Sequence, residues 1–204
     1  MISHGMLVRL EARPGKNAEV EELLRSVRPM VGNEPGTAAW FGVKFGRLDY
    51  GIFDVFPDEA SRDAHMQGPV AQALTERQAD LFTTAPKFEK LHVLAHKLPP
   101  QSTGTVDAKA ILLTFKSKMG HQRDVEHFLR GAESIVQDEP GTTAWFAFHL
   151  FSGDYGIFDV FPDKGARFRH LTGQVPRALA KNAFSLLGSV PDVELMDVVQ
   201  EKLN

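Results

Sequence analysis

The sequence contains no cysteine among its 204 residues. This absence excludes disulfide bridges, a thiol nucleophile and cysteine-based metal or iron–sulfur sites. Acidic and basic residues nearly balance, at 26 and 23, and they are well mixed, which disfavours a nucleic-acid partner. No apolar run is long enough to span a bilayer, and the first residues lack the pattern of a signal peptide. We therefore expect a cytoplasmic protein that binds neither membranes nor nucleic acid.

The sequence does contain an internal repeat with an offset of 105 residues. The stretch Asp49–Asp58 recurs unchanged as Asp154–Asp163, and Glu34–Thr37 recurs as Glu139–Thr142. Two copies are too few for a solenoid and suit a pseudo-dimer. We therefore predict one module over 1–98, a second over 108–204, and a linker rich in Pro, Gly and hydroxyl residues over 99–107.

Each copy has the same predicted order of elements. In the first copy this order is a strand at 6–12, a helix at 20–31, a strand pair at 38–45 and 50–56, a helix that follows the N-cap Asp58, and a strand at 88–96. Pro29 is expected to kink the first helix near its end. The order βαββαβ predicts an α+β fold made of two tandem ferredoxin-like modules.

The predicted strands are apolar on both faces. Successive residues of a strand point to opposite faces, and both sets contain aromatic and aliphatic residues. A sheet with one face in water shows alternation instead. Helices cover one face of each module, so the other face must be covered as well. We expect the two modules to pack sheet to sheet, as an intramolecular pseudo-dimeric α/β barrel.

Three features of each copy carry a family resemblance. They are Glu34–Thr37, Asp54–Ala60 and His65 in the first copy, and Glu139–Thr142, Asp159–Asp163 and His170 in the second. The sequence resembles the antibiotic biosynthesis monooxygenase (ABM) family of the dimeric α/β-barrel superfamily. The resemblance covers nearly the whole chain, once per half. It implies a fold that other members form by dimerisation, and oxidation of quinols or anthrone-like aromatics by O₂ without a cofactor.

The sequence departs from this family at three points. Many members carry Trp where Phe56 and Phe161 stand, and enzymatic members often carry an Asn in the first strand that neither copy has. Haem-degrading relatives have a haem-ligating His near the positions of Thr75 and Ala180. We therefore expect no cofactor.

Asp54 and Asp159 lie in the middle of an aromatic strand, where a carboxylate is costly unless it is paired or hydrogen-bonded. One interpretation is a general base with a raised pKa that takes a proton from a phenol or an activated C–H. The other is a structural carboxylate that forms an ion pair or caps backbone amides. Arg9 is a candidate partner in the first copy.

His65 and His170, on the second helix of each copy, are candidate proton shuttles or ligand contacts. They fit equally well as packing residues that hydrogen-bond to the backbone. The copies also differ in the second strand, where Gly42 and Lys44 of the first correspond to Ala147 and His149 of the second. These differences predict unequal pockets, with room at Gly42 in the first copy and a titratable His149 in the second.

Several aromatic side chains are candidate walls or polar contacts of a substrate pocket, although core packing explains them as well. They are Trp40, Trp145, Tyr50, Tyr155, Phe56 and Phe161. His92 and His96 are too far apart on one strand to form a metal site without a third ligand, so no metal is expected.

The family resemblance implies a cofactor-independent monooxygenase-like enzyme that acts on a small aromatic molecule of the quinol or anthrone type and uses O₂. The catalytic candidates are Asp54, Asp159, His65, His170 and His149. The alternative is a non-enzymatic barrel that binds a small hydrophobic ligand or serves in assembly. We expect the chain to be a monomeric pseudo-dimer or a homodimer of that unit.

Overall fold

The computed structural model of the chain describes residues 1–99 and 107–203. They form two compact units, one of residues 1–91 with 197–203 and the other of residues 92–99 with 107–196. Each half of the sequence thus contributes the end of its last strand to the unit of the other half. The predicted linker at 99–107 lies almost entirely outside the described residues, and the boundaries of the two modules stay predictions.

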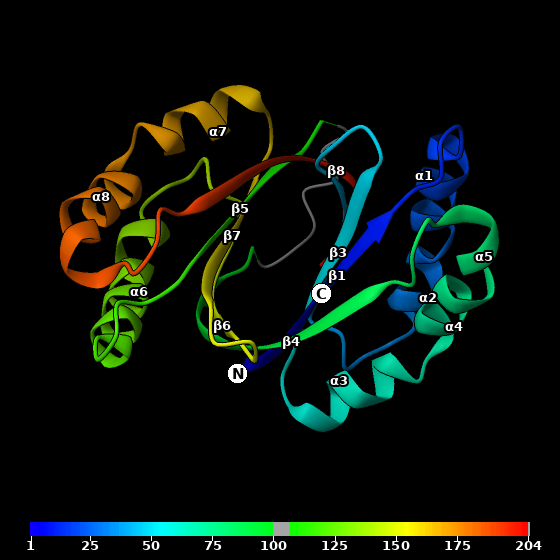
Figure 1. Cartoon of the computed structure of the whole chain (residues 1–204), viewed down its shortest axis with the longest axis horizontal. Coiled ribbons are helices and arrows are strands. Elements are labelled where there is room, and N and C mark those ends of the chain that lie inside the picture. The colour runs from blue at the N-terminus through cyan, green and yellow to red at the C-terminus, as the bar shows by residue number, and fades with distance from the viewer. Residues whose placement is uncertain (100–106, 204) are drawn as a thin grey trace. The chain divides into compact units, whose positions relative to one another are not determined.

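Both halves have the predicted βαββαβ order (Figure 1). The elements of the first half are β1 (His4–Glu11), α1 (Asn17–Ser26), α2 (Arg28–Gly32), β2 (Ala39–Lys44), β3 (Asp49–Phe56), α3 (Glu59–Met66), α4 (Pro69–Glu76), α5 (Gln78–Leu81) and β4 (Lys87–Lys97). Those of the second half are β5 (Lys109–Phe115), α6 (Gln122–Gln137), β6 (Ala144–Leu150), β7 (Tyr155–Phe161), α7 (Lys164–Leu171), α8 (Gln174–Leu186) and β8 (Asp192–Leu203).

The hydrogen-bonded strand order is β1-β3-β2-β8-β5-β7-β6-β4, and it closes into a barrel. Strand β3 pairs with β1 and β2, and β7 pairs with β5 and β6, all antiparallel. The end of β8 continues the first unit, because Asp197–Leu203 pair with β2. The predicted α+β fold class with a pseudo-dimeric barrel is therefore confirmed.

Local signals account for the ends of the helices. The carboxylates of Asp58 and Asp163 accept hydrogen bonds from the backbone N–H of Ser61 and Ala166, each at 2.8 Å, which makes both residues N-caps as predicted. Pro29 occupies the first turn of α2, where the predicted kink separates α1 from α2. The corresponding helix of the second half, α6, has no proline and is continuous.

The helices of each unit lie on one face of its strands (Figure 1). In the first unit this face carries Met6, Trp40, Ile52 and Phe56, which pack with helical residues such as Leu74 in one buried cluster. None of the described helices is long and apolar enough to cross a membrane.

Candidate functional site

A buried aspartate occupies the middle of the helix-covered face in each half. Asp54 lies opposite Met6 of β1 and Trp40 of β2, and Asp159 has the same position in β7, opposite Ile111 and Trp145. Asp54 is fully buried and Asp159 is 3% exposed. Burial disfavours the charged form, so it raises the pKa of both carboxyls, that of Asp159 to about 7.

A histidine of the following helix joins each aspartate to a glutamate. In the second half His170 Nδ1 lies 2.7 Å from Glu139 Oε2, and His170 Nε2 lies 3.8 Å from Asp159 Oδ2. In the first half the corresponding contacts of His65, with Glu34 and Asp54, are 2.5 and 3.2 Å. We refer to Glu34, His65 and Asp54 as the first triad.

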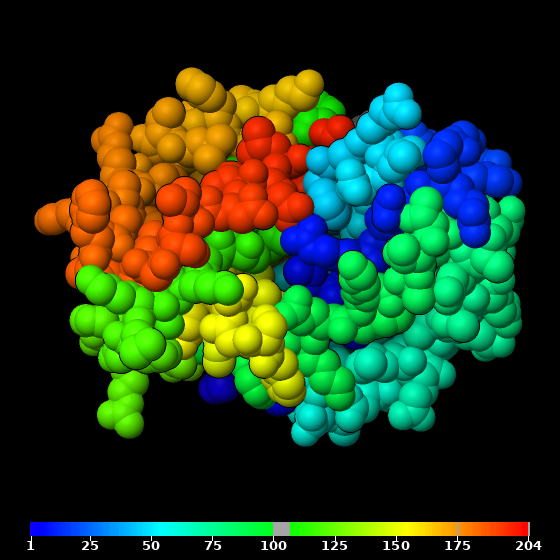
Figure 2. All heavy atoms as spheres, viewed as in Figure 1, coloured from blue at the N-terminus to red at the C-terminus, as the bar shows by residue number. Residues whose placement is uncertain are grey.

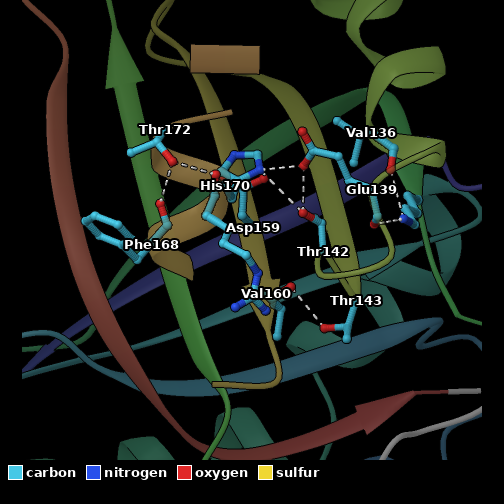
Figure 3. A network of polar contacts seen from close by, with 11 residues as sticks. Val136, Glu139, Thr142, Thr143, Asp159, Val160, Phe168, His170 and Thr172 are labelled. Carbon is cyan, nitrogen blue, oxygen red and sulfur yellow. Dashed lines mark hydrogen bonds and ion pairs between the residues drawn. The ribbon is translucent and has the colours of Figure 1, made fainter. Parts of the chain in front are cut away.

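The second triad consists of Glu139, His170 and Asp159. Figure 3 shows its imidazole joined by dashed lines to Glu139 and Thr142. The Thr142 hydroxyl donates to Glu139 Oε2 at 3.0 Å, as Thr37 does to Glu34 at 2.8 Å. The runs Glu34–Thr37 and Glu139–Thr142 have the sequence Glu-Pro-Gly-Thr, and we call them the EPGT motif. The motif therefore supplies both a carboxylate and the hydroxyl that orients it.

The charges of the first triad are tightly coupled. Burial alone would lower the pKa of His65, but the Asp54 and Glu34 carboxylates outweigh it and raise the pKa to about 10. The pKa of Glu34 is lowered, because the hydrogen bond and charge of His65 outweigh its own burial. The raised pKa of His65 therefore favours an imidazolium between Glu34 and Asp54 near neutral pH.

The end of β4 belongs to the second unit and the end of β8 to the first, and we call them the exchanged strand ends. A lysine from each of them contacts the backbone of the EPGT turn. Lys97 Nζ donates to the backbone carbonyls of Val136 at 2.8 Å and Glu139 at 2.7 Å. In the other unit, Lys202 Nζ donates to the carbonyls of Glu34, at 3.3 Å, and of Thr37. These two lysines and the two glutamates are not among the site residues predicted from the sequence.

The second triad borders a cavity of about 430 Å³ between the strands and helices of its unit. Asp159 and His170 supply its charged and titratable groups, and the rest of the lining is apolar: Ile111, Leu113, Ile157, Leu171, Pro176, Leu179, Ala180, Ala183, Leu187, Pro191 and Val193. Leu171 and Val193 are 39% and 47% exposed, so the cavity opens to the surface beside them. Helix α8 and the start of β8 lie side by side on the face shown in Figure 2.

In the first half two of these positions carry longer side chains within a continuous core. Met6 and Phe82 replace Ile111 and Leu187, and both are 1% exposed and packed in one cluster with Phe56. In the second half, Ile111, Phe161 and Ala166 form a small cluster of their own, apart from the cluster that contains Ile157. The two halves therefore differ in their packing around the aspartate, and the residues that differ are not those at the positions of Gly42 and Lys44.

Two sequence-based expectations about neighbouring residues are wrong. A Cβ atom at Gly42 would lie 2.9 Å from the Trp40 ring, so that ring fills the room expected there. Arg9 does not face Asp54, because Met6 is the residue opposite Asp54 and Arg9 lies an odd number of positions further along β1. Its guanidinium lies over the Phe45 ring, and His65 is the partner of Asp54.

The predicted aromatic residues fall into two groups. Phe56 and Phe161 pack against His65 and His170, with ring centroids 5.2 and 5.1 Å apart. Trp40 and Trp145 are fully buried beside the aspartates, and within the described parts of the chain their indole N–H groups have no hydrogen-bond partner.

The second group lies at the other end of β3 and β7. The hydroxyls of Tyr50 and Tyr155 donate to Glu21 at 3.2 Å and to Glu126 at 3.3 Å. The His149 ring stacks on Tyr155 with centroids 4.6 Å apart. Tyr155 precedes Asp159 by four strand residues, about 13 Å, so this group is separate from the cavity. Roles for these residues as ligand contacts stay predictions.

Within residues 1–99 and 107–203, no cluster of three or more histidine, aspartate or glutamate side chains is arranged to hold a metal ion.

Comparison with known proteins shows the fold. A putative monooxygenase from Fusobacterium nucleatum matches all of this chain and 95% of its own, with a TM-score of 0.86 and 11% identity. An anthrone oxidase-like protein matches 98% of this chain and 92% of its own, with a TM-score of 0.68 and 11% identity. A protein of unknown function from Nitrosomonas europaea matches 48% of this chain and 96% of its own, at 45% identity and a TM-score of 0.48.

No protein-family model and no curated protein matches the sequence. At 11% identity the first two structures establish architecture rather than activity. The chain therefore has the closed eight-stranded α/β-barrel fold of these monooxygenase-like proteins, formed within a single polypeptide.

Proposed function

We propose that the second half of the chain binds a small neutral aromatic molecule with one weakly acidic O–H or C–H group, and that Asp159 removes that proton. The observation that carries this proposal is the position of one atom, Asp159 Oδ1. It belongs to a carboxylate that lines the apolar cavity, it is buried, and it has no hydrogen-bond partner among the described residues. A buried acceptor without a donor is costly, and an acidic ligand group would satisfy it.

The cavity favours a particular class of ligand. Its volume of about 430 Å³ lies in the range of small-molecule sites, and its lining is apolar around one acid–base group. A ligand that is already anionic would meet the Asp159 carboxylate in a medium of low polarity, which is unfavourable. A neutral aromatic with a single acidic group suits the site better.

The pKa of Asp159, raised to about 7, suits this group to act as a general base near neutral pH. Loss of a proton from a quinol or an anthrone leaves an electron-rich anion. For an anthrone-type CH₂ group, the anion transfers electrons to O₂, one oxygen atom becomes the new carbonyl oxygen, and the other leaves as water with the two hydrogens lost by carbon. The protein excludes water, orients the ring and moves protons. We thus propose a cofactor-independent monooxygenase-like activity.

Three findings support this choice of reaction: the family resemblance of the sequence, the fold shared with a protein named anthrone oxidase-like, and a carboxylate base in an apolar cavity.

The test is oxygen uptake with a panel of quinols and anthrones, with Asp159→Asn beside the wild type. We expect uptake with at least one anthrone or quinol, and a loss of about 100-fold or more in Asp159→Asn, since general base catalysis contributes factors of that order. Asp54→Asn is the matched control in the first half, where the aspartate lies beside a continuous buried core, and it should retain the wild-type rate. Uptake that never exceeds that of buffer, or equal losses in both variants, would contradict the proposal.

A second candidate function is the storage or transport of an apolar ligand without chemistry, and the predominantly apolar lining of the cavity favours it. Equilibrium binding of the same panel separates the two functions. A carrier would bind these molecules with no oxygen uptake, and Asp159→Asn would bind them as tightly as the wild type or more tightly.

A further inference from the structure

His170 forms part of the wall between the apolar cavity and a second, polar cleft. The second cleft has a volume of about 310 Å³, and His170 and Glu139 both line it, together with Thr142 and Arg169. The apolar cavity is lined by His170 and Asp159. The His170 ring therefore has Nε2 towards Asp159, which lines the apolar cavity, and Nδ1 towards the Glu139 carboxylate, which lines the polar cleft.

The contacts of Glu139 decide which nitrogen of His170 carries the hydrogen in the neutral ring. Glu139 Oε2 accepts from the Thr142 hydroxyl at 3.0 Å and lies 2.7 Å from His170 Nδ1. A carboxylate only accepts hydrogen bonds, so Nδ1 is the donor. The lone pair of Nε2 is then directed at Asp159, as in a histidine whose orientation a carboxylate fixes for proton transfer.

The position of Glu139 is fixed from the backbone side. Lys97 donates to the Glu139 carbonyl, and the Glu139 N–H donates to Val136 O at 3.0 Å. The Glu139 side chain is 22% exposed, so its carboxylate also meets water. The titratable and charged groups around this path are Asp159, Asp138, Glu139, Arg169 and Lys97.

We propose that His170 and Glu139 accept the proton that Asp159 takes from a ligand. The ligand O–H or C–H loses its proton to the free Oδ1 of Asp159. Rotation about the Cβ–Cγ bond brings the protonated oxygen towards His170 Nε2, which accepts the proton while Asp159 becomes a carboxylate again. The imidazolium that forms is stabilised by Glu139, which is thus a positioning residue, and the proton returns by the same path or passes to water in the outer cleft.

The distance of 3.8 Å between Nε2 and Oδ2 is compatible with this step, because such contacts shorten when one group becomes a donor. The first triad has the same residues, but its aspartate is fully buried beside a continuous core. Glu34→Gln therefore provides a matched control for Glu139→Gln. The identity of the ligand rests on the proposed function, whereas the proton path has a test that needs no turnover.

The first measurement is the ¹⁵N NMR titration of the His170 ring in the protein without ligand, assigned with His170→Gln. In the wild type the neutral ring should carry its hydrogen on Nδ1, and Glu139→Gln should move part of the population to the Nε2–H tautomer, because an amide can donate to Nδ1 as well as accept from it. Thr142→Val removes one donor to Glu139, and a smaller change of the same kind is expected. An unchanged tautomer population in Glu139→Gln, or the same change in Glu34→Gln, would overturn the proposal.

The second measurement adds 4-nitrophenol, whose phenolate absorbs visible light, to the wild type and to Glu139→Gln. In the wild type we expect bound phenolate, an imidazolium ¹⁵N signal for His170, and no proton released to the buffer in calorimetry. In Glu139→Gln the bound phenolate fraction should fall about tenfold or more. Bound phenolate with an unchanged His170 signal would overturn the proton path while leaving Asp159 as base, whereas absence of binding would count against the proposed function alone.

Discussion

Met6 and Ile111 occupy equivalent positions of the repeat, directly opposite Asp54 and Asp159, yet Ile111 lines a cavity while Met6 is 1% exposed in a continuous core. Phe82 belongs to the same core, whereas its smaller counterpart Leu187 lines the cavity. The exchange of Phe for Leu therefore contributes to the difference in packing between the halves, since interiors respond to changes of a few methylenes.

Transferring the larger side chain should close the cavity. We expect Leu187→Phe to reduce the affinity for an aromatic ligand about tenfold or more, a change of about 1.4 kcal/mol, because its ring would take the space of the ligand. The free energy of unfolding should stay the same or rise, since the added ring fills empty space. Fluorescence titration with an aromatic ligand and urea denaturation would measure the two effects. An unchanged affinity would show that this cavity is not the binding site.

Much of the fold was predictable because its signals are local or repeated. The N-caps Asp58 and Asp163 and the kink at Pro29 follow from single residues. The barrel follows from strands that are apolar on both faces, since such strands need cover on each side. The exchange of strand ends had no local signal, because it depends on the pairing of Asp197–Leu203 with a strand more than 150 residues earlier.

The site was only partly predictable for a related reason. Asp159 and His170 stand out as polar residues in apolar surroundings, but Glu139 lies 31 residues from His170 on a turn, where a glutamate is ordinary. The cavity depends on side-chain volumes at positions spread from Ile111 to Val193. A comparison of the two copies contains part of the signal, because Phe82 stands where the second copy has Leu187, but this difference gains meaning only after the structure has brought the lining positions together.

The raised pKa of Asp159 has a consequence for stability. Since its folded-state pKa of about 7 exceeds the ordinary value of 3.8, the folded protein binds this proton more tightly than the unfolded chain does. Stability should therefore fall as pH rises from about 4 to about 7, by at most about 4 kcal/mol. Asp159→Asn lacks this contribution. The free energy of unfolding of the variant, relative to that of the wild type, should therefore rise as pH increases from about 4 to about 7. Urea denaturation at several pH values tests this, and a difference independent of pH would contradict it.

His65 should show a dependence of the same sign in a higher pH range. Its pKa is raised from 6.5 to about 10, so the stabilisation is complete below pH 6.5 and is lost as pH rises towards 10. At pH 6 we expect His65→Gln to cost about 3 kcal/mol, because it leaves Asp54 and Glu34 without their shared partner. The cost should shrink between pH 6.5 and 10. Thermal unfolding of both proteins across this range is the measurement, and a cost that grows with pH would refute the ion-pair assignment.

Lys97 allows the contribution of the exchanged strand end to be measured on its own. Its ammonium group donates to two carbonyl oxygens, those of Val136 and Glu139, where helix α6 ends and the EPGT turn begins. Lys97→Met keeps much of the apolar stem but leaves both carbonyls without this donor, and hydrogen bonds to a charged group contribute about 1.5–3 kcal/mol. We expect a loss of about 2 kcal/mol in unfolding free energy, together with faster amide exchange in residues 138–143. If the loss occurred without a change in exchange at this turn, Lys97 would stabilise the unit by packing rather than by holding Glu139 beside His170.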